Sequence, residues 1–419
     1  MPRFYSLPHL AAALSLCAVT ACAPVGRQLL GNPENPYPRT ATPKVGEIVH
    51  LPTGTRVTMA QMLAVARDAR IIYVGETHDN PASHRLELDI LKGLAESGPG
   101  RQALGMEMFV HSQQPVLDRW VAGELDEKAF IKESRWFDNW KADFDYYRDL
   151  LIFARDHNIP VIALNAEKSQ IETVRRKAPD QLGPEERARL PELDLADPYQ
   201  RGMVKAIFGD HVRGEMQLDG FVRAQTLWDE TMAESVAGYL SSPAGEGRQM
   251  LVVTGGYHVE YGFGIPRRVF RRLPASYVVI CGLEIDIPPE KQDQIMDVTL
   301  PLFPMVPSDF TVYLAYESLP QAGVRLGVEI GPAAPAGRGI LVRSVGAGSN
   351  AERAGLKAGD LMLSFDGAPL AGSYDLIFAV KRKKAGDHGE LQIERQGRRA
   401  RLDVLFQAVG TDKSPNQKR

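Results

Sequence analysis

Two segments of this chain share one pattern, an apolar run that ends in Gly-x-x-His. Residues 71–78 read Ile-Ile-Tyr-Val-Gly-Glu-Thr-His, and residues 250–258 read Met-Leu-Val-Val-Thr-Gly-Gly-Tyr-His. Short β-branched apolar runs are typical of strands that are buried on both faces of a parallel sheet. In open α/β sheets, ligands bind outside the carboxyl ends of the strands. His78 and His258 are therefore the first candidates for a functional site.

Strand-like and helix-like segments alternate along residues 46–290. The expected strands cover residues 71–75, 103–108, 160–165, 250–255 and 277–282, and the expected helices cover residues 82–96, 115–122, 126–134, 143–157 and 219–240. Such alternation predicts an α/β domain in which helices flank a mainly parallel sheet. A chain of 419 residues has room for a second domain.

Polar residues stand at the predicted strand ends. Glu76 and His78 follow the first strand, Glu107 and Asn165 close two others, and His258 follows the fourth. Burial of an acid is costly without a partner, so Glu107 either pairs with a histidine or a cation, or reaches solvent. Because parallel strands carry their carboxyl ends at one edge, the sequence predicts a polar cluster there. Such a cluster suits a metal ion, a proton-transfer pair or a haem contact.

Two features near the first histidine leave alternatives open. His84 lies about one turn into the next predicted helix, where it either joins the cluster or faces water. Residues 136–147 are rich in Trp, Phe and Tyr. The helical spacing of Phe144, Tyr147 and Leu151 favours plain core, whereas the same rings would also suit the wall of a pocket for a flat hydrophobic ligand.

The first 22 residues resemble a bacterial lipoprotein signal peptide. Arg3 precedes an apolar stretch at residues 10–19, which is too short to span a bilayer, and Val-Thr-Ala-Cys at residues 19–22 is similar to a lipobox. This pattern predicts cleavage before Cys22 and lipidation of its thiol, which would anchor the protein to a membrane. The alternative is a simple signal peptide that leaves Cys22 unmodified.

The residues after Cys22 bear on the location of the anchor. Residues 23–45 are rich in Pro, Gly, Asn and Thr, which suits an extended tether. Ala23 is not the Asp that favours retention in the inner membrane. We therefore expect a protein of the bacterial cell envelope, anchored in the outer membrane and facing the periplasm.

Composition and missing motifs exclude several classes of function. The net charge is −3 and no long basic stretch occurs, so we expect no nucleic-acid partner. Beyond Cys22 the only cysteine is Cys281, expected to be buried, so neither a disulfide framework nor a cysteine zinc site can form. The chain lacks a Walker loop and a Cys-x-x-Cys-His motif, which argues against nucleotide hydrolysis and covalent haem.

The C-terminal third has a different pattern. Residues 291–322 read as a linker with one or two strands, and residues 409–419 as a disordered tail. Between them, residues 323–408 resemble a bacterial PDZ domain, most clearly in Ala-Glu-Arg-Ala-Gly-Leu-Lys-Ala-Gly-Asp at residues 351–360. Asp366 followed by Gly367 predicts a tight hairpin turn.

The PDZ resemblance implies a small β-rich domain with a peptide groove. A C-terminal or extended peptide would bind at the backbone amides of Leu326, Gly327 and Val328 and add a strand to the edge of the sheet. On this interpretation the protein has a peptide or protein partner.

Over residues 46–285 the chain resembles the ChaN-type haem-binding lipoprotein family of the Tiki superfamily. The motifs that carry the resemblance are Val-Gly-Glu-Thr-His-Asp-Asn-Pro at residues 74–81 with His84, Gly-Met-Glu-Met-Phe at 105–109, Ile-Pro-Val-Ile-Ala-Leu-Asn-Ala at 159–166, Trp-Asp-Glu-Thr-Met-Ala at 228–233 and Gly-Tyr-His at 256–258. The resemblance implies an α/β fold, a lipid anchor, non-covalent haem linked to iron or haem uptake, and haem shared between the protomers of a homodimer.

The resemblance also implies a set of haem-contacting residues, which are Glu76, His78, His84, Tyr147, Asn165, Tyr257 and His258. In the family a tyrosine holds the haem, and Tyr147 and Tyr257 are the candidates in this chain. Two positions depart from the family pattern. Ser83 stands where many relatives have a second consecutive histidine, and Glu87 stands where glutamine is usual.

Two other functions compete with haem binding. The wider superfamily includes metal-dependent proteases and erythromycin-esterase-like hydrolases. In a hydrolase, Glu76, His78, Glu107 and His258 would form the catalytic centre, with a divalent metal ion on Glu76, His78 and His258. Alternatively, the protein is chiefly an adaptor that acts through its PDZ groove. Whether the protein is an enzyme therefore stays open at this stage.

Overall fold

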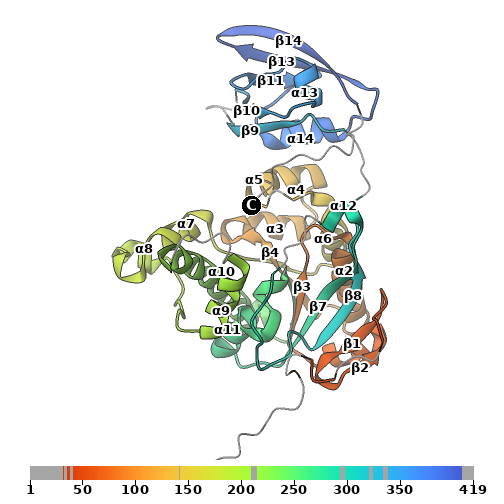
Figure 1. Ribbon diagram of the computed structural model, residues 1–419, viewed down its shortest axis with the longest axis vertical. Helices are drawn as coiled ribbons and strands as arrows, with labels where there is room; N and C mark the ends of the chain where they lie inside the picture. Colours follow the sequence, from red (N-terminus) through yellow and green to blue (C-terminus); the bar gives the residue numbers. More distant parts are fainter. Residues whose placement is uncertain are drawn as a thin grey trace, which may run out of the picture.

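The structure is a computed structural model of the chain. It describes residues 32, 35–37, 41–140, 142–208, 215–292, 298–319, 324–333 and 338–407. The signal peptide, Cys22, most of the tether and the 409–419 tail lie outside the described residues. Figure 1 shows a larger α/β domain followed by a smaller β-rich domain, as the sequence predicts. No helix within the described ranges is long and apolar enough to cross a membrane.

The described part of the larger domain forms one eight-stranded sheet in the order β2-β1-β8-β7-β3-β6-β4-β5. Its strands are β1 (Ile48–His50), β2 (Thr55–Val57), β3 (Ile71–Glu76), β4 (Gln102–Val110), β5 (Val161–Asn165), β6 (Gln249–Gly255), β7 (Tyr277–Asp286) and β8 (Phe310–Ala315). The six strands from β8 to β5 are parallel, and β1 pairs antiparallel with β2 and β8. The predicted mainly parallel sheet is confirmed.

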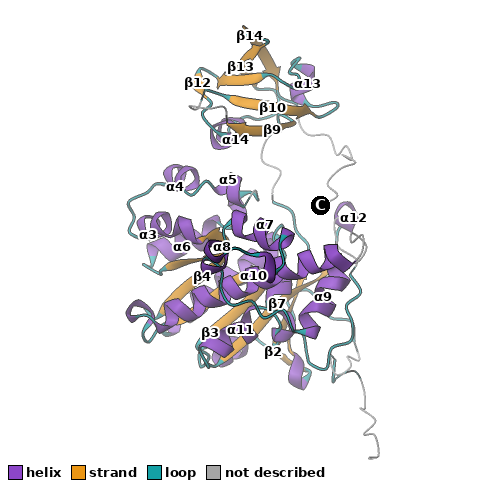
Figure 2. Ribbon diagram, turned by 90° about the vertical axis from the view of Figure 1, so that its left-hand side faces the viewer, coloured by secondary structure: helices purple, strands orange, loops and turns teal. Residues whose placement is uncertain are grey.

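Helices cover both faces of this sheet (Figure 2). One group contributes to the largest core cluster and consists of α1 (Met59–Ala66), α2 (Pro81–Ser97), α3 (Gln114–Val121), α4 (Glu127–Glu133), α5 (Trp136–Asn139) and α6 (Arg148–Asp156). The second core cluster contains residues of α10 (Glu215–Ser241) and α11 (Ile265–Arg272). The remaining described helices of this domain are α7 (Lys168–Arg176), α8 (Pro184–Ala188), α9 (Pro198–Phe208) and α12 (Pro289–Gln292).

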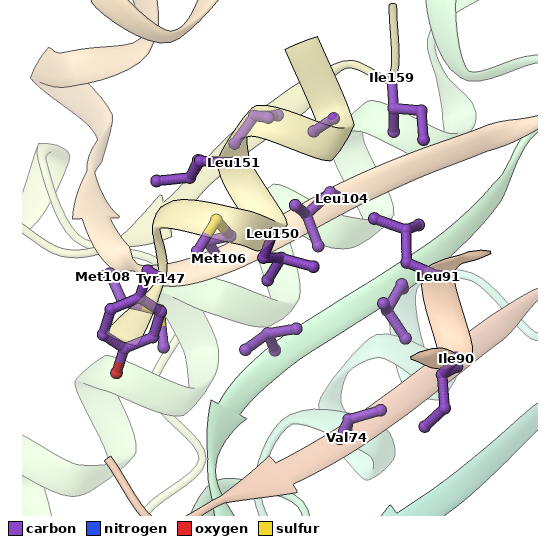
Figure 3. Packing of buried hydrophobic residues seen from close by; sticks show 14 of the residues in the cluster. Val74, Ile90, Leu91, Leu104, Met106, Met108, Tyr147, Leu150, Leu151 and Ile159 are labelled. Atoms are coloured by element: carbon purple, nitrogen blue, oxygen red, sulfur yellow. The ribbon is translucent and has the colours of Figure 1, made fainter. Parts of the chain in front are cut away.

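The two core clusters explain why the strands read as continuous apolar runs. Side chains alternate between the faces of a strand. In β3, Ile72 and Val74 join the cluster under α2 and α6, whereas Ile71 and Tyr73 join the cluster under α10 and α11. Figure 3 shows Val74 in the first of these clusters. Both faces of β3 are therefore buried, as expected for a central parallel strand.

The neighbouring strands β3 and β6 leave the sheet in opposite directions. β3 connects through α2 to β4, whereas β6 connects through α11 to β7, so each connection passes over the other strand. The two strands pair in register from Ile71 opposite Met250 to Glu76 opposite Gly255. The two predicted Gly-x-x-His segments therefore leave the sheet side by side at its carboxyl edge.

The predicted linker of residues 291–322 contains a strand of the large sheet. β8 pairs parallel with β7 and antiparallel with β1, and Phe310, Val312 and Leu314 are buried in the first core cluster. The first domain therefore extends to residue 315, beyond the boundary expected at residue 290. The polar and proline-rich residues before the strand hid this extension in the sequence.

The smaller domain is built on an antiparallel sheet in the order β14-β13-β11-β10-β9 with β12 beside β11. Its elements are β9 (Val328–Ala333), β10 (Ile340–Val345), α13 (Asn350–Arg353), β11 (Leu361–Phe365), β12 (Ala368–Pro369), α14 (Ser373–Lys381), β13 (His388–Arg395) and β14 (Arg398–Leu405). Asp366 and Gly367 both have positive φ in the turn between β11 and β12. The predicted hairpin turn is confirmed, and the Cys281 side chain is buried as expected.

A buried ion-pair group fixes α11 to α10. Glu230 of α10 is fully buried. Its carboxylate lies 3.1 Å from Arg268 Nε, 3.0 Å from Arg271 Nη2 and 2.7 Å from Arg272 Nη1. Arg268 is itself 2% exposed, so its positive charge is compensated by this carboxylate rather than by water. Removal of one partner of a buried ion pair leaves an uncompensated charge in the interior.

We therefore predict that Glu230→Ala lowers the free energy of unfolding by about 3–5 kcal/mol. The measurement is guanidinium-induced unfolding of the soluble chain without residues 1–22. Glu234→Ala is the matched control because Glu234 lies on the same helix and is exposed, and it should change the free energy by less than about 0.5 kcal/mol. Equal losses in the two variants would contradict the prediction.

Candidate functional site

The loop after β3 places the first group of site residues. Glu76 is the last residue of β3, and α2 begins at Pro81 with Asn80 as its N-cap, whose side chain accepts a hydrogen bond from the Ala82 amide at 3.0 Å. Proline suits this position because the first helical amides need no partner within the helix. His84 therefore lies one turn into α2 and faces back toward the strand end. It is buried, so the alternative in which it faces water is excluded.

The first group is centred on the Glu76 carboxylate. Tyr147 donates its hydroxyl proton to Oε1 at 2.7 Å, and His78 Nδ1 lies 2.5 Å from the same oxygen. The other oxygen, Oε2, lies 3.1 Å from His84 Nδ1. Glu87 completes the group, with its Oε2 atom 3.3 Å from the same nitrogen. One buried carboxylate thus joins strand, loop and two helices.

The second group is centred on His258, in the turn after β6. Its Nδ1 atom lies 2.6 Å from Asp229 Oδ1 of α10, and its Nε2 atom lies 3.5 Å from Glu107 Oε1 of β4. Glu107 Oε2 also accepts a hydrogen bond from the Gly255 amide at 2.8 Å. Glu107 is therefore buried and paired, and the alternative in which it reaches solvent is excluded.

His78 lies between the two groups. Its ring packs against Gly255. If Gly255 had a β-carbon, that carbon would lie 3.0 Å from the His78 ring and 3.7 Å from Glu107 Oε2. On another side the ring meets Trp140 edge to face, with centroids 4.9 Å apart. The His78 side chain is 44% exposed, whereas the Glu76 and Glu107 side chains are 0% and 8% exposed. His78 is therefore the point at which this buried cluster reaches the surface.

Together the two groups form an alternating series of carboxylates and imidazoles, which we call the acid–histidine chain. Its members are, in spatial order, Glu87, His84, Glu76, His78, Glu107, His258 and Asp229. It follows the carboxyl edge of the sheet from α2 to α10. The convergence of strand ends that the sequence predicts places four of its members.

Opposite charges within the acid–histidine chain stabilise one another. Burial acts to lower the pKa of His84, but the carboxylates of Glu76 and Glu87 raise it to about 11. Burial likewise opposes charge on His258, but Glu107 and Asp229 raise its pKa to about 10. Burial also acts to raise the pKa of Glu76, yet the His84 charge and hydrogen bonds hold it well below its usual range. Charged imidazoles thus keep the neighbouring acids ionised.

Glu87 titrates in the opposite direction. Burial and the charge of Glu76 raise the Glu87 pKa well above its usual range, because His84 alone does not compensate two carboxylates. For His78, burial acts against charge, but the hydrogen bond and charge of Glu76 raise its pKa.

The two candidate tyrosines lie in different surroundings. Tyr147 is fully buried, and burial together with Glu76 raises its pKa well above the usual range, so its hydroxyl stays protonated as a donor to Glu76. Tyr257 is half-buried and lines a small cavity with Gln225, Asp229 and Phe263. The Asn165 side-chain amide donates a hydrogen bond to the backbone carbonyl of Glu107 at 2.9 Å, so this amide holds β5 to β4.

The aromatic segment of residues 136–147 belongs mainly to the core, which is the first of its two predicted roles. Trp136, Phe144 and Tyr147 are fully buried in the first core cluster. Trp140 is only partly buried, contacts His78, and donates its indole N–H to the Tyr147 hydroxyl at 3.3 Å. Core packing therefore holds one indole at the edge of the site.

The predicted metal ligands do not form one group. Of the described residues, the only set of three or more His, Cys, Asp or Glu whose ligand atoms lie close enough for one ion is Glu76, His84 and Glu87, with all ligand atoms within 4.8 Å. The expected trio of Glu76, His78 and His258 is not such a set, because His258 is turned toward Asp229 and Glu107. The sequence interpretation also did not include Asp229 among the site residues, although an acid between buried Leu227 and Met232 of α10 is a signal for a buried partner.

Comparisons with known proteins bear on both domains. A family model described as haem-binding uptake, Tiki superfamily, ChaN matches residues 62–269, and a PDZ domain model matches residues 323–405. A probable DegP-like periplasmic serine endoprotease of Pseudomonas putida (strain W619) is 40% identical over 74 residues, which are 18% of this chain and 15% of that protein. A protein of the same description from Marinomonas sp. (strain MWYL1) is 35% identical over 74 residues, or 16% of its length. The chain thus spans less than a fifth of these relatives.

Solved structures are similar to each part of the chain. A structure of cofacial haem binding to ChaN of Campylobacter jejuni covers 63% of this chain and 95% of that chain, at 17% identity and a TM-score of 0.49. The HtrA-type protease AlgW with a decapeptide covers 20% of this chain and 29% of that chain, at 24% identity and a TM-score of 0.19. On the family models, this chain belongs to the ChaN family of haem-binding domains of the Tiki superfamily over residues 62–269, and it carries a PDZ domain at residues 323–405.

Proposed function

We propose that this protein is a lipid-anchored, periplasm-facing haem-binding protein that serves iron or haem uptake, and that its PDZ domain recruits a peptide or protein partner. The observation that carries the proposal is the environment of His78 in a ChaN-family domain. His78 is half-exposed, is held by a buried carboxylate and lies beside Trp140. A polar ligand atom next to an apolar ring at the surface suits a flat apolar group that contains iron.

The hydrogen bonds of His78 fit a role as an iron ligand. An imidazole that binds a metal usually donates its other N–H to a carboxylate, which fixes the tautomer and raises the basicity of the ligating nitrogen. His78 Nδ1 lies 2.5 Å from Glu76 Oε1 and so carries that proton. Its Nε2 atom, which has no hydrogen-bond partner among the described residues, remains for the iron. We propose that His78 contacts haem directly and that Tyr147 acts indirectly by orienting Glu76.

Tyr257 stays the second candidate for an iron ligand. It is half-buried and follows β6 one residue before His258, on the same edge of the sheet as His78. Burial raises its pKa, so a bound cation would have to displace the phenol proton. We propose that Glu76, His84 and His258 support the site from within the acid–histidine chain.

Our proposal for the location and assembly of the protein rests on the sequence. We propose that Cys22 carries the lipid and that the anchor lies in the outer membrane, with the two domains in the periplasm. The lipobox-like residues 19–22 and Ala23 support this location. A homodimer that shares haem between its protomers is part of the proposal, because the family resemblance implies it.

We predict that His78→Ala weakens haem binding by at least about tenfold, because it removes a ligand and its orienting contact. The measurement is a haemin titration of the soluble chain without residues 1–22, followed by Soret absorbance. His388→Ala is the control, since His388 is an exposed histidine of the PDZ domain. Tyr257→Phe and Tyr147→Phe in the same assay separate the two tyrosines, and Tyr147→Phe should cost less than His78→Ala. Unchanged saturation in His78→Ala would refute His78 as a contact.

The pH dependence of haem binding follows from the raised pKa of His78. The ligating imidazole must be neutral, and Glu76 favours its charged form. Haem affinity should therefore fall as the pH falls through the raised pKa of His78, by up to about tenfold per pH unit below it. Glu76→Gln removes the charge that raises this pKa, so the loss should move to lower pH. A pH profile that is identical in the two proteins would contradict this assignment.

We propose that the peptide groove of the PDZ domain lies along β9. β9 is the last strand in the sheet order, so its outer edge has no strand partner among the described residues, and α14 lies beside it. The backbone amides of Leu326 and Gly327 donate no hydrogen bond within the described part of the chain. Free amides next to an open strand edge are suited to a C-terminal carboxylate and to strand addition.

We predict that this groove retains peptides with a free C-terminal carboxylate and an apolar last residue. A pool of such peptides should bind at least about tenfold better than the same pool with amidated ends, as measured by mass spectrometry of the retained fraction. Gly327→Ala should abolish retention, because its β-carbon would lie 2.3 Å from Ser349 Cβ. Gly348→Ala is the matched control. Gly348 also has a positive φ, but a β-carbon there would meet no atom within 4 Å. Equal retention of both pools would contradict the prediction.

A metal-dependent hydrolase remains the second candidate function. The observation that favours it is the pairing of His258 with Asp229 at 2.6 Å, because a carboxylate that orients an imidazole is typical of acid–base catalysis. Activity against peptides or esters that is lost in His258→Ala and on chelation would support this function.

A further inference from the structure

A second, smaller site lies beneath the haem-facing residues. Glu76, His84 and Glu87 meet where β3 turns into α2, and their side chains are at most 5% exposed. Their ligand atoms all lie within 4.8 Å of one another. The site shares Glu76 with the acid–histidine chain, but it faces the interior, away from the half-exposed ring of His78.

The hydrogen bonds of His84 determine which atoms face this site. His84 Nε2 lies 3.1 Å from the backbone carbonyl oxygen of His78. A carbonyl oxygen only accepts, so Nε2 carries a proton. The Nδ1 atom therefore points at the two carboxylates, 3.1 Å from Glu76 Oε2 and 3.3 Å from Glu87 Oε2. When a metal ion displaces the Nδ1 proton of the charged imidazole, this nitrogen and one oxygen of each carboxylate can each offer a lone pair to the same point.

Two carboxylate oxygens of this group make no hydrogen bond within the described residues. Glu76 Oε2, which faces His84, and Glu87 Oε1 are buried and have no hydrogen-bond partner among the described residues. Glu87 is completely buried. Two buried carboxylates beside one imidazole leave an excess of negative charge, and burial of such charge is costly without a cation or an added proton.

The ligand set selects the cation. Two carboxylate oxygens and one imidazole nitrogen suit a divalent first-row transition metal ion. The His84 Nε2–H bond to a backbone carbonyl and the Tyr147 hydroxyl bond to Glu76 Oε1 supply the outer contacts that orient such ligands. The carboxylate oxygens lie 3.1 and 3.3 Å from His84 Nδ1. Two ligand atoms that each bind one ion at about 2.1 Å lie about one and a half bond lengths apart, so these separations fit a shared ion.

We propose that Glu76, His84 and Glu87 bind one divalent first-row transition metal ion, such as Mn²⁺ or Zn²⁺, in a structural site beneath the haem-facing surface. The ion replaces the proton that otherwise sits among the three side chains. This site does not rest on the proposed haem function. Glu76 is the only one of its ligands that contacts the His78 side chain, and His84 contacts only the His78 backbone carbonyl.

The test is a titration of metal-depleted soluble protein with Mn²⁺ and, separately, with Zn²⁺. Calorimetry gives the stoichiometry, and the electron paramagnetic resonance of Mn²⁺ reports bound ion without reference to any activity. We expect one ion per chain. Glu87→Gln keeps the shape of the side chain and removes its charge, and it should weaken binding at least about tenfold. Glu96→Gln is the matched control because Glu96 is an exposed acid on the same helix.

Two further variants separate this site from the haem site. His84→Ala should abolish metal binding, with circular dichroism to verify that the variant is folded. His78→Ala should retain metal binding within about threefold although it weakens haem binding, since His78 is not among the three ligands. Metal affinity that is equal in Glu87→Gln, Glu96→Gln and the unaltered chain would overturn the proposal. The absence of any stoichiometric ion would also overturn the proposal, because the three side chains would then only share a proton.

Discussion

Burial of acids at the carboxyl edge of the sheet is the constraint on which the site depends. Glu76, Glu87, Glu107 and Asp229 are all nearly inaccessible to water, and a carboxylate in that position needs a positive partner. Three imidazoles supply it, one between each successive pair of acids. The pKa of His84 rises to about 11 and that of His258 to about 10 for this reason. Loss of one member would leave the charge of its nearest neighbours less well balanced.

The sheet topology makes this arrangement possible because β3 and β6 are adjacent and in register. Glu76 pairs with Gly255, and the missing side chain at Gly255 leaves room for the His78 ring. A substituent there would push His78 away from Glu107 and break the series between its two groups. The glycine before each histidine therefore serves two different needs. A β-carbon on Gly75 would lie 3.0 Å from Cys281 Sγ and from Gly256 Cα, so Gly75 allows close packing, whereas Gly255 leaves room for a functional side chain.

Much of the fold was predictable because its signals are local. The central strands are continuous apolar runs, and the convergence of Glu76, His78, Glu107 and His258 follows from parallel strand ends alone. Other features required tertiary information. Asp229 lies in the middle of a long helix, and only the packing of α10 brings it to His258. Likewise β8 joins the sheet through β7 and β1, which a reading of neighbouring residues does not reveal.

The two domains meet at the segment that also contains Trp140, the neighbour of His78. In α14, Ser373 Oγ lies 3.0 Å from Asp138 Oδ1, and Lys381 Nζ lies 2.5 Å from Asp143 Oδ1. Tyr374 of the same helix packs against the core cluster that contains Trp136 and Tyr147. Exposed ion pairs of this kind contribute at most about 1 kcal/mol each, so the apolar packing of Tyr374 is the larger part of this contact. Because α14 lies beside β9, a peptide bound along β9 would contact α14, the helix that also contacts α5 in residues 136–147. The fold thus brings α14 of the PDZ domain into contact with the same short segment that places Trp140 beside His78.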